Sequence, residues 1–570
     1  MIIRVVLALA LSAPPVLIPA APASAAPQPR PCPVAVPART TCGFLTVPER
    51  RDAPGRTIRV GYALHRSAAR DRRPDPVVYM SGGPGSASLQ LTGFLAQMFP
   101  DRDVVTVEQR GGRYSEPVLS CPETAAALLG QLRTPRDDVA AAAVRCRDRL
   151  REQGVDLRGY TTREIAADVV ALRRELGYPS WNLFGVSYST RVMALAAATD
   201  PDGTRSLVLD SYLPQSVAWY DDAARNLTDT IARLGAADAY AAMVARLNAS
   251  PARVPTTDPL LGRAFTARMS GDDVSAVLFE GLAEADVAAV APQLVRALAT
   301  GHDELLRPLA DAVGEGLVSH EFGLYHAVQC QDELPFNTGR SPLFTHRADQ
   351  AVCDAWGLPR SPPEQGVPRA PAFVLGGRYD PTTPVRTSRP AAAALPGARF
   401  VEVPHASHAV FLSSACARRE IAGFVADPAG RTAAPCLDPP ITPGELRVTA
   451  APYEISRAPW LAAPFAVFAL TALAQLVVAG LRGRAFAAFG GLCGVAFAGL
   501  TGQAVWGLAA RNETALAVGV PAVVGPCTWI AVAAVALTAV GAALRWRRWP
   551  GWAATAVGGG FLVWWLVWFL

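Results

Sequence analysis

The 570-residue chain lacks the marks of several protein classes. It has no C-x-x-C pair, and no histidine stands at ligand spacing from a cysteine, which argues against a zinc site. No internal repeat is present. Before residue 458, acidic and basic residues are equal in number, so this part has no net charge with which to neutralise phosphates. No nucleic-acid partner is expected.

Hydrophobic residues make up 51% of the chain and are concentrated at its two ends. Residues 1–25 are typical of a secretory signal, because the apolar stretch from Val5 to Leu17 is followed by the cleavage pattern Ala23-Ser24-Ala25. A membrane anchor is the weaker interpretation, since the stretch is short and contains Pro14 and Pro15. We therefore expect the part that follows to be exported.

At the other end, residues 459–570 contain four apolar stretches, each long enough to cross a membrane as a helix: 460–481, 485–509, 515–544 and 551–570. With an exported part before them, the loop 511–514 and the C-terminus lie outside. The basic residues that then face the cytoplasm are Arg482, Arg484, Arg545, Arg547 and Arg548. No ionisable residue lies near a span centre, so the region is expected to be an anchor in contact with membrane lipid.

Eight of the ten cysteines precede the apolar stretches, and Cys493 and Cys527 lie within them. An even number of cysteines in an oxidising compartment predicts disulfides. Order and separation favour four pairs, although eight cysteines allow about 105 connectivities. The favoured pairs are Cys32 with Cys42, Cys121 with Cys146, Cys330 with Cys353, and Cys416 with Cys436.

Strand-like and helix-like segments alternate through much of the exported part. The strand-like segments are Arg59 to His65, Val77 to Ser81, Val104 to Glu108, Trp181 to Val186, Leu207 to Ser211, Ala372 to Gly376 and Arg399 to Val403. This alternation predicts an α/β fold with a largely parallel sheet covered on both faces. We expect residues 26–214 and 369–440 to form the core, 215–368 a helical cap, and 441–458 a linker.

Ser187 lies where an apolar strand meets an alanine-rich helix, in Gly185-Val186-Ser187-Tyr188-Ser189. A sharp strand-to-helix turn of this kind is a nucleophile elbow, which exposes the hydroxyl of a serine above the sheet. The pattern G-x-S-x-G is incomplete, because Ser189 takes the place of the second glycine. The pattern alone is weak evidence for a serine hydrolase, and it needs partner residues.

A nucleophilic serine needs a base and a carboxylate that orients the base. Asp380 and His408 supply them in the order serine, aspartate, histidine, each on a loop after a predicted strand. His405 is the rival base. We prefer His408, because the small residues Ala406 and Ser407 before it suit a loop that approaches the nucleophile closely.

Acyl transfer also needs two backbone N–H groups that point at the oxyanion. Tyr188, directly after the serine, supplies the first candidate, and Gly83 in Ser81-Gly82-Gly83-Pro84-Gly85 supplies the second. A bare turn is the alternative interpretation of the glycine run. This chemistry requires no cofactor, and we expect none.

Together these motifs resemble the α/β-hydrolase serine peptidases of the prolyl and tripeptidyl aminopeptidase type, especially secreted forms with a TAP-like C-terminal segment. The matching pieces are Gly82 to Gly85, Glu108 to Gly111 with Ser115 and Pro117, Gly185 to Arg191, Leu207 to Asp210, Ala327 to Cys330, Asp380-Pro381 with Thr383-Pro384, and Cys416 with Cys436. The resemblance implies an α/β-hydrolase fold with a helical cap, here followed by an all-α four-helix transmembrane region.

Three positions depart from the family pattern. Ser81 replaces the usual histidine before the glycine run, Glu108 replaces an aspartate, and Ser189 replaces the second elbow glycine. None of these changes removes an atom of the triad formed by Ser187, Asp380 and His408. They bear instead on substrate preference.

The resemblance also implies removal of residues or short peptides from free peptide N-termini. Such an enzyme needs an anionic group for the substrate ammonium, and Asp332 and Glu333 are the candidates, with a solvated charged turn as the alternative. Two other functions stay open. One is an esterase or lipase with the same triad, and the other is a catalytically inactive binding ectodomain on a membrane protein.

Overall fold

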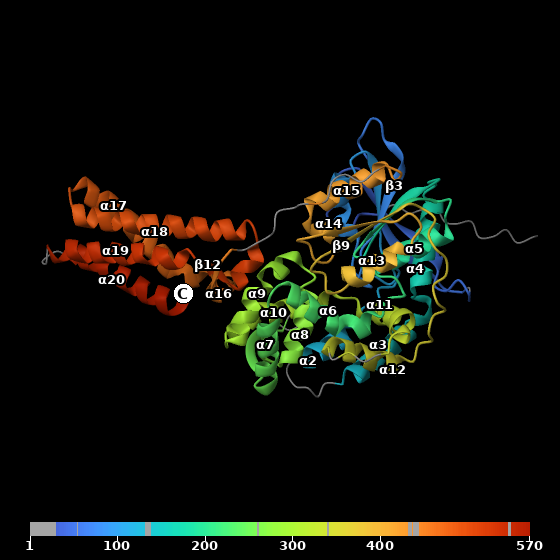
Figure 1. Cartoon of the computed structure of the whole chain (residues 1–570), viewed down its shortest axis with the longest axis horizontal. Helices are drawn as coiled ribbons and strands as arrows, with labels where there is room; N and C mark the ends of the chain where they lie inside the picture. Colours follow the sequence, from blue (N-terminus) through green and yellow to red (C-terminus); the bar gives the residue numbers. More distant parts are fainter. Residues whose placement is uncertain are drawn as a thin grey trace, which may run out of the picture.

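The computed structural model describes residues 30–570 except 54, 132–137, 259–261, 339, 340, 342, 431–435, 437–443 and 545–548. The predicted signal segment 1–25 and the basic residues from Arg545 to Arg548 lie outside the described residues. An α/β part and a bundle of long helices follow one another along the longest axis of the molecule (Figure 1).

An eight-stranded sheet forms the centre of the α/β part, with the order β1-β2-β4-β3-β5-β6-β9-β10. Its strands are β1 (Thr40–Pro48), β2 (Thr57–His65), β3 (Arg73–Met80), β4 (Arg102–Val107), β5 (Trp181–Val186), β6 (Thr204–Asp210), β9 (Ala372–Gly377) and β10 (Arg399–Val403). Along this order, neighbouring strands from β4 to β10 are parallel. Strand β2 is antiparallel to both of its neighbours, β1 and β4. The prediction of a largely parallel sheet is confirmed, but β1 was missed.

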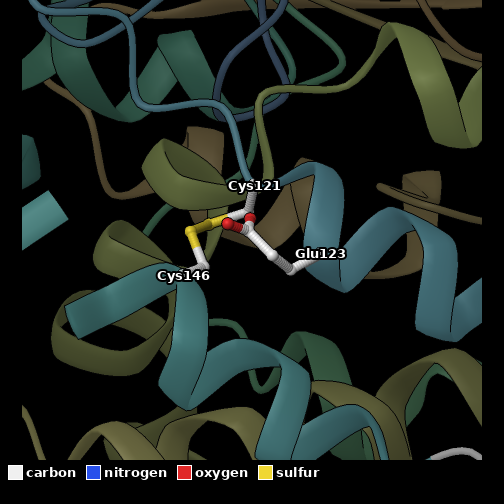
Figure 2. Close-up of side chains that lie close together, drawn as sticks. All are labelled: Cys121, Glu123 and Cys146. Carbon is white, nitrogen blue, oxygen red and sulfur yellow. A yellow bond between two sulfur atoms is a disulfide. The ribbon is translucent and has the colours of Figure 1, made fainter. Parts of the chain in front are cut away.

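Four disulfides cross-link this part, and they join the four pairs favoured by the sequence. Cys121 and Cys146 lie close to Glu123, as Figure 2 shows. Their sulfur atoms are bonded to each other, and the carboxylate of Glu123 pairs with Arg149 at 2.6 Å. This cluster therefore offers no thiolate to a metal ion.

Helices cover both faces of the sheet because alternate strand residues point to opposite sides. The core helices are α1 (Thr92–Met98), α2 (Pro122–Gln131), α3 (Val139–Glu152), α4 (Thr162–Glu175), α5 (Tyr188–Thr199), α13 (Val385–Ala393), α14 (Val410–Ser413) and α15 (Ala415–Ala426). Val78 and Met80 pack toward α4 and α5, whereas Val77 and Tyr79 pack toward α1 and α15.

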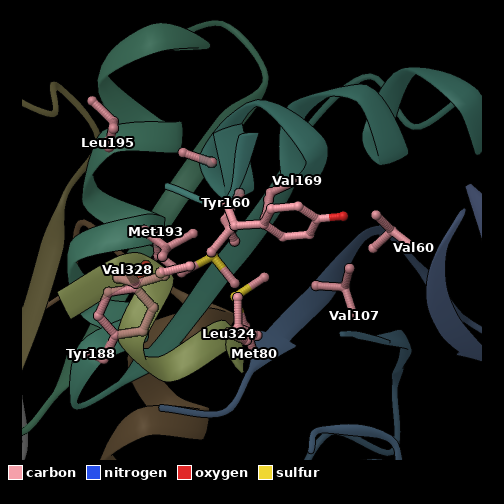
Figure 3. Close-up of a cluster of buried hydrophobic side chains, with 14 of the residues drawn as sticks. Val60, Met80, Val107, Tyr160, Val169, Tyr188, Met193, Leu195, Leu324 and Val328 are labelled. Carbon is pink, nitrogen blue, oxygen red and sulfur yellow. The ribbon is translucent and has the colours of Figure 1, made fainter. Parts of the chain in front are cut away.

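Residues 215–368, called the insertion below, separate β6 from β9. They contain α6 (Trp219–Arg233), α7 (Ala237–Ala249), α8 (Gly271–Gly281), α9 (Ala285–Ala299), α10 (Leu306–Ser319), α11 (Phe322–Val328), α12 (Phe344–Trp356) and the hairpin β7 (Ala252–Thr257) with β8 (Ala264–Met269). The prediction of helices alone missed this hairpin. Leu324 and Val328 of α11 pack in the same cluster as Tyr188 and Met193 of α5 (Figure 3). The insertion thus shares the core under Ser187.

Among the residues that the structure describes, four helices near the C-terminus are long and apolar enough to cross a membrane: Pro459–Leu481, Ala485–Ala509, Val524–Ala543 and Trp552–Phe569. Their elements are α17 (Ala463–Leu481), α18 (Ala485–Ala509), α19 (Val524–Ala543) and α20 (Trp549–Trp564). The predicted start of the third span at residue 515 was wrong. There the short strand β12 (Gly519–Pro521) pairs with β11 (Leu446–Val448) of the predicted linker, which also contains α16 (Ala451–Arg457).

Candidate active site

Ser187 occupies the sharp turn between β5 and α5. Its backbone has φ 56° and ψ −127°, in the region that non-glycine residues rarely adopt, and its N–H donates to Asp210 O at 2.9 Å. A Cβ at Gly185 would lie 2.6 Å from Ser189 O, and a Cβ at Gly82 would lie 2.8 Å from Ser187 Cβ. The two glycines therefore give the turn the space that it needs.

Ser189, which departs from the family pattern, is fully buried and has a clear structural role. Its hydroxyl accepts a hydrogen bond from Val186 N at 2.8 Å and donates to Met80 O at 2.7 Å. Glycine could make neither bond. The serine therefore ties the elbow to the end of the neighbouring strand β3.

Asp380 follows β9 and contacts His408, which follows β10. The Nδ1 atom of His408 lies 2.8 Å from Asp380 Oδ2. Burial disfavours the charged imidazolium, but the charge and hydrogen bond of Asp380 outweigh this and raise the pKa of His408. Burial likewise opposes ionisation of Asp380, but His408 and hydrogen bonds from Thr383 lower the pKa of its carboxyl. Of the two histidines in this loop, His408 is the one that contacts Asp380.

Asp210 links the serine turn to the histidine loop, a role that sequence reasoning missed. Its carbonyl accepts the Ser187 N–H, while its carboxylate accepts Val410 N at 2.9 Å and Phe411 N at 2.7 Å. Burial raises the pKa of Asp210 to about 6, against the hydrogen bonds from these two amides. A carboxylate at the end of a buried strand is the signal that could have identified it.

The glycine run from Ser81 to Gly85 is held by Gln109, a second residue whose role was missed. Gln109 Nε2 donates to Ser81 O and Gly82 O at 2.9 and 2.7 Å, and its Oε1 accepts Gly85 N at 2.9 Å. Gly83 has φ 106°, which favours glycine. Because Tyr188 is the first residue of α5, its N–H has no intrahelical partner.

A narrow cavity of about 30 Å³ lies beside Ser187. It is lined by Gly83, Pro84, Ser187, Tyr188, Leu213, Trp219, Gln329, Glu333 and Thr382. Both predicted oxyanion residues and one of the two predicted ammonium-binding residues therefore line the same cavity as the serine. Asp332 is not among the lining residues, and its carboxylate accepts hydrogen bonds from the backbone and hydroxyl of Thr162.

Acidic groups outnumber basic ones around Glu333, which lines this cavity. Arg191 of α5 is buried and pairs with Glu333 at 2.6 Å and with Glu364 at 3.7 Å. Burial raises the pKa of Glu364 to about 7 and also raises that of Glu333, although Arg191 opposes both shifts. A bound cation would stabilise the ionised carboxylates, so the arrangement suits a ligand ammonium.

Comparison with known proteins agrees with this geometry. The sequence model of the alpha/beta hydrolase fold matches residues 75–415. The chain belongs to the alpha/beta hydrolase family. Among its relatives, serine protease Hip1 of Mycobacterium tuberculosis is 24% identical over 417 residues, which cover 62% of this chain and 78% of the relative. Tripeptidyl aminopeptidase of Streptomyces lividans is 28% identical over 198 residues, covering 31% and 37%. The putative hydrolase YuaR of Escherichia coli is 23% identical over 226 residues, covering 37% and 43%.

Proposed function

We propose that this alpha/beta hydrolase is a membrane-anchored serine peptidase that removes residues from free N-termini through an acyl-enzyme at Ser187. The observation that carries the proposal is the hydrogen bond between His408 and Asp380 at the sheet edge where the strained turn of Ser187 ends β5. The similarity to a serine protease and a tripeptidyl aminopeptidase supports a peptide substrate.

In the proposed mechanism, Asp380 accepts the Nδ1–H of His408, which leaves Nε2 free to take the proton of Ser187 Oγ. The serine oxygen attacks the carbonyl carbon of the substrate, and the N–H groups of Gly83 and Tyr188 stabilise the oxyanion. His408 then returns the proton to the leaving amine as the C–N bond breaks. Water, activated by the same histidine, hydrolyses the ester and regenerates the serine.

Glu333 is proposed to hold the substrate ammonium. It lines the cavity beside Ser187 and pairs with the guanidinium of Arg191. Two further carboxyl groups, those of Asp332 and Glu364, also interact with Arg191. Because the anionic group and the nucleophile share one narrow cavity, this arrangement favours the release of single residues over tripeptides.

The proposed location is the cell membrane, with the catalytic part outside the cytoplasm. The disulfides support an oxidising compartment. The loop between the second and third spans pairs through β12 with β11, and Phe569 O near the C-terminus accepts the hydroxyl of Thr449 at 2.8 Å. These contacts support a topology in which the loop and the C-terminus lie on the same side of the membrane as the catalytic part, which is also the topology favoured by the charge of the loops.

The test uses the full-length protein in detergent. A fluorophosphonate probe should label the wild type and the Ser413→Ala control, whose exposed serine lies in α14, but not Ser187→Ala. Hydrolysis of an aminoacyl reporter should be lost with the label, and the N-acetylated form of the reporter should not be cleaved. Labelling without aminoacyl hydrolysis, together with rapid cleavage of a short-chain ester, would show an esterase instead.

An unlabelled wild type would point to the inactive binding ectodomain.

A further inference from the structure

The bundle of apolar helices packs against the insertion. Leu508, Ala515 and Val518, from the end of α18 and the segment after it, belong to the hydrophobic cluster built by the insertion. The insertion residues of this cluster include Leu247, Phe279, Val290, Leu294 and Leu298. In Figure 1, α9 and α10 lie next to α16 at the end of the bundle. The bundle is thus docked against the insertion by a shared apolar core.

Polar contacts fix this docking. Asn512, only 1% exposed, donates from Nδ2 to Asp286 O at 2.9 Å and accepts Ala515 N at 3.1 Å. It therefore caps the turn Glu513–Ala517 and at the same time holds the first turn of α9. At a second point of contact, Arg307 of α10 pairs with Glu454 at 2.6 Å.

The residues before α9 contact the histidine loop. Ala283 O accepts the backbone N–H of His408 at 3.0 Å, and Leu282 O accepts the hydroxyl of Ser407. Residues 282–286, called the joint below, run from the end of α8 at Gly281 into the first turn of α9. One side of the joint is bonded to the loop of the catalytic base, and its other end is bonded to Asn512.

We infer that Asn512 is a positioning residue for His408 and that the outer loop of the bundle acts on the active site through the joint. The inference rests on the proposed role of His408 as the base. A single span would anchor the protein, but it would supply no loop between two spans. The docked loop gives the additional spans a role, because it fixes the carbonyl groups on which the histidine loop is held.

The test compares two substitutions at position 512 in the full-length protein. Asn512→Asp and Asn512→Ser each keep an acceptor for Ala515 N. The carboxylate of the first has no hydrogen to donate to Asp286 O, and the hydroxyl of the second is one bond shorter than the amide group that reaches Asp286 O. Loss of one neutral hydrogen bond from the reacting arrangement corresponds to about a fivefold decrease in a rate constant. Asn512→Ser should therefore be labelled by fluorophosphonate about fivefold more slowly than the wild type, and Asn512→Asp at least as slowly, because its carboxylate faces the carbonyl oxygen of Asp286. In both variants kcat should be reduced and KM for the aminoacyl reporter unchanged. Arg307→Gln, which loosens the docking away from the joint, should retain the wild-type rate.

A double-mutant cycle separates positioning from a general loss of stability. Ser407→Ala removes the hydroxyl that contacts Leu282 O. In the double variant with Asn512→Ser, the labelling rate should fall by less than the product of the two single effects, because both substitutions act on the joint. In the double variant of Ser407→Ala with Arg307→Gln, the two effects on the labelling rate should multiply. Wild-type labelling rates in both position-512 variants, or multiplicative effects in the first cycle, would overturn the inference. An unlabelled wild type would instead refute the proposed function.

Discussion

Replacing Asp380 by asparagine tests the proposed base most sharply, because the structure dictates how the new side chain must sit. Oδ1 of Asp380 accepts two backbone N–H groups, Thr382 N at 2.8 Å and Thr383 N at 2.9 Å. Oδ2 faces His408 Nδ1 at 2.8 Å and accepts the Thr383 hydroxyl at 2.7 Å. An amide oxygen will stay with the two backbone donors, so the NH2 group will face the histidine.

This orientation forces the wrong tautomer. The amide NH2 of Asp380→Asn can only donate to His408 Nδ1, so the ring must carry its proton on Nε2 and cannot accept the proton of Ser187. In serine proteases the equivalent substitution lowers kcat about 10⁴-fold. That factor corresponds to about 5.4 kcal/mol of transition-state stabilisation. We expect a loss of the same order here.

The assay is the pH profile of kcat/KM for an aminoacyl reporter. In the wild type the acid limb should lie above the ordinary imidazole pKa, because Asp380 raises the pKa of His408 and only the neutral ring accepts a proton. Asp380→Asn removes that charge, so the limb should move to lower pH while the plateau falls. Asp427→Asn, at an exposed position, is the control. A variant that kept a tenth of the activity at unchanged pH dependence would refute the reasoning.

Three further predictions concern Gln109, Glu333 and the buried carboxyl group of Glu108. Gln109→Glu replaces the NH2 group that donates to Ser81 O and Gly82 O by an oxygen, so the glycine run should lose its support. We expect kcat to fall about tenfold or more and fluorophosphonate labelling of the folded protein to slow in parallel, and an unchanged kcat would contradict the role given to Gln109. Glu333→Gln should raise KM for free-amine reporters without slowing hydrolysis of a short-chain ester, and equal losses on both substrates would contradict ammonium binding. Burial raises the pKa of Glu108 to about 7, so the folded state binds the extra proton and the free energy of unfolding should fall as pH rises from about 4.5 to 7. In Glu108→Gln that fall should diminish, which denaturant titrations at several pH values will show.

Much of the core could be predicted because its signals are local. β5 and β10 were predicted within a residue or two, since strands of a parallel sheet leave short apolar runs in the sequence. The loops that carry Ser187, Asp380 and His408 follow from this order. β1 was missed because its pairing with β2 is antiparallel at the sheet edge and its sequence contains Gly43 and Pro48.

Long-range contacts could not be predicted from periodicity. The β7–β8 hairpin contains Pro255, and the pairing of β11 with β12 joins segments on either side of two apolar helices. The roles of Gln109 and Asp210 depend on which backbone amides the fold brings to them. The hydrogen bonds from Thr162 to the carboxylate of Asp332 could not be predicted either, because residues so distant in the sequence leave no shared pattern.

The central claim is that Ser187 forms an acyl-enzyme with a substrate that carries a free amine. Rapid quenching of the full-length protein with an aminoacyl ester, followed by mass spectrometry of its peptides, measures this directly. We predict an aminoacyl adduct on the peptide that contains Ser187, absent in Ser187→Ala and absent when the amine of the substrate is acetylated. An adduct that persists in Ser187→Ala, or one that forms equally well from the acetylated ester, would contradict the account.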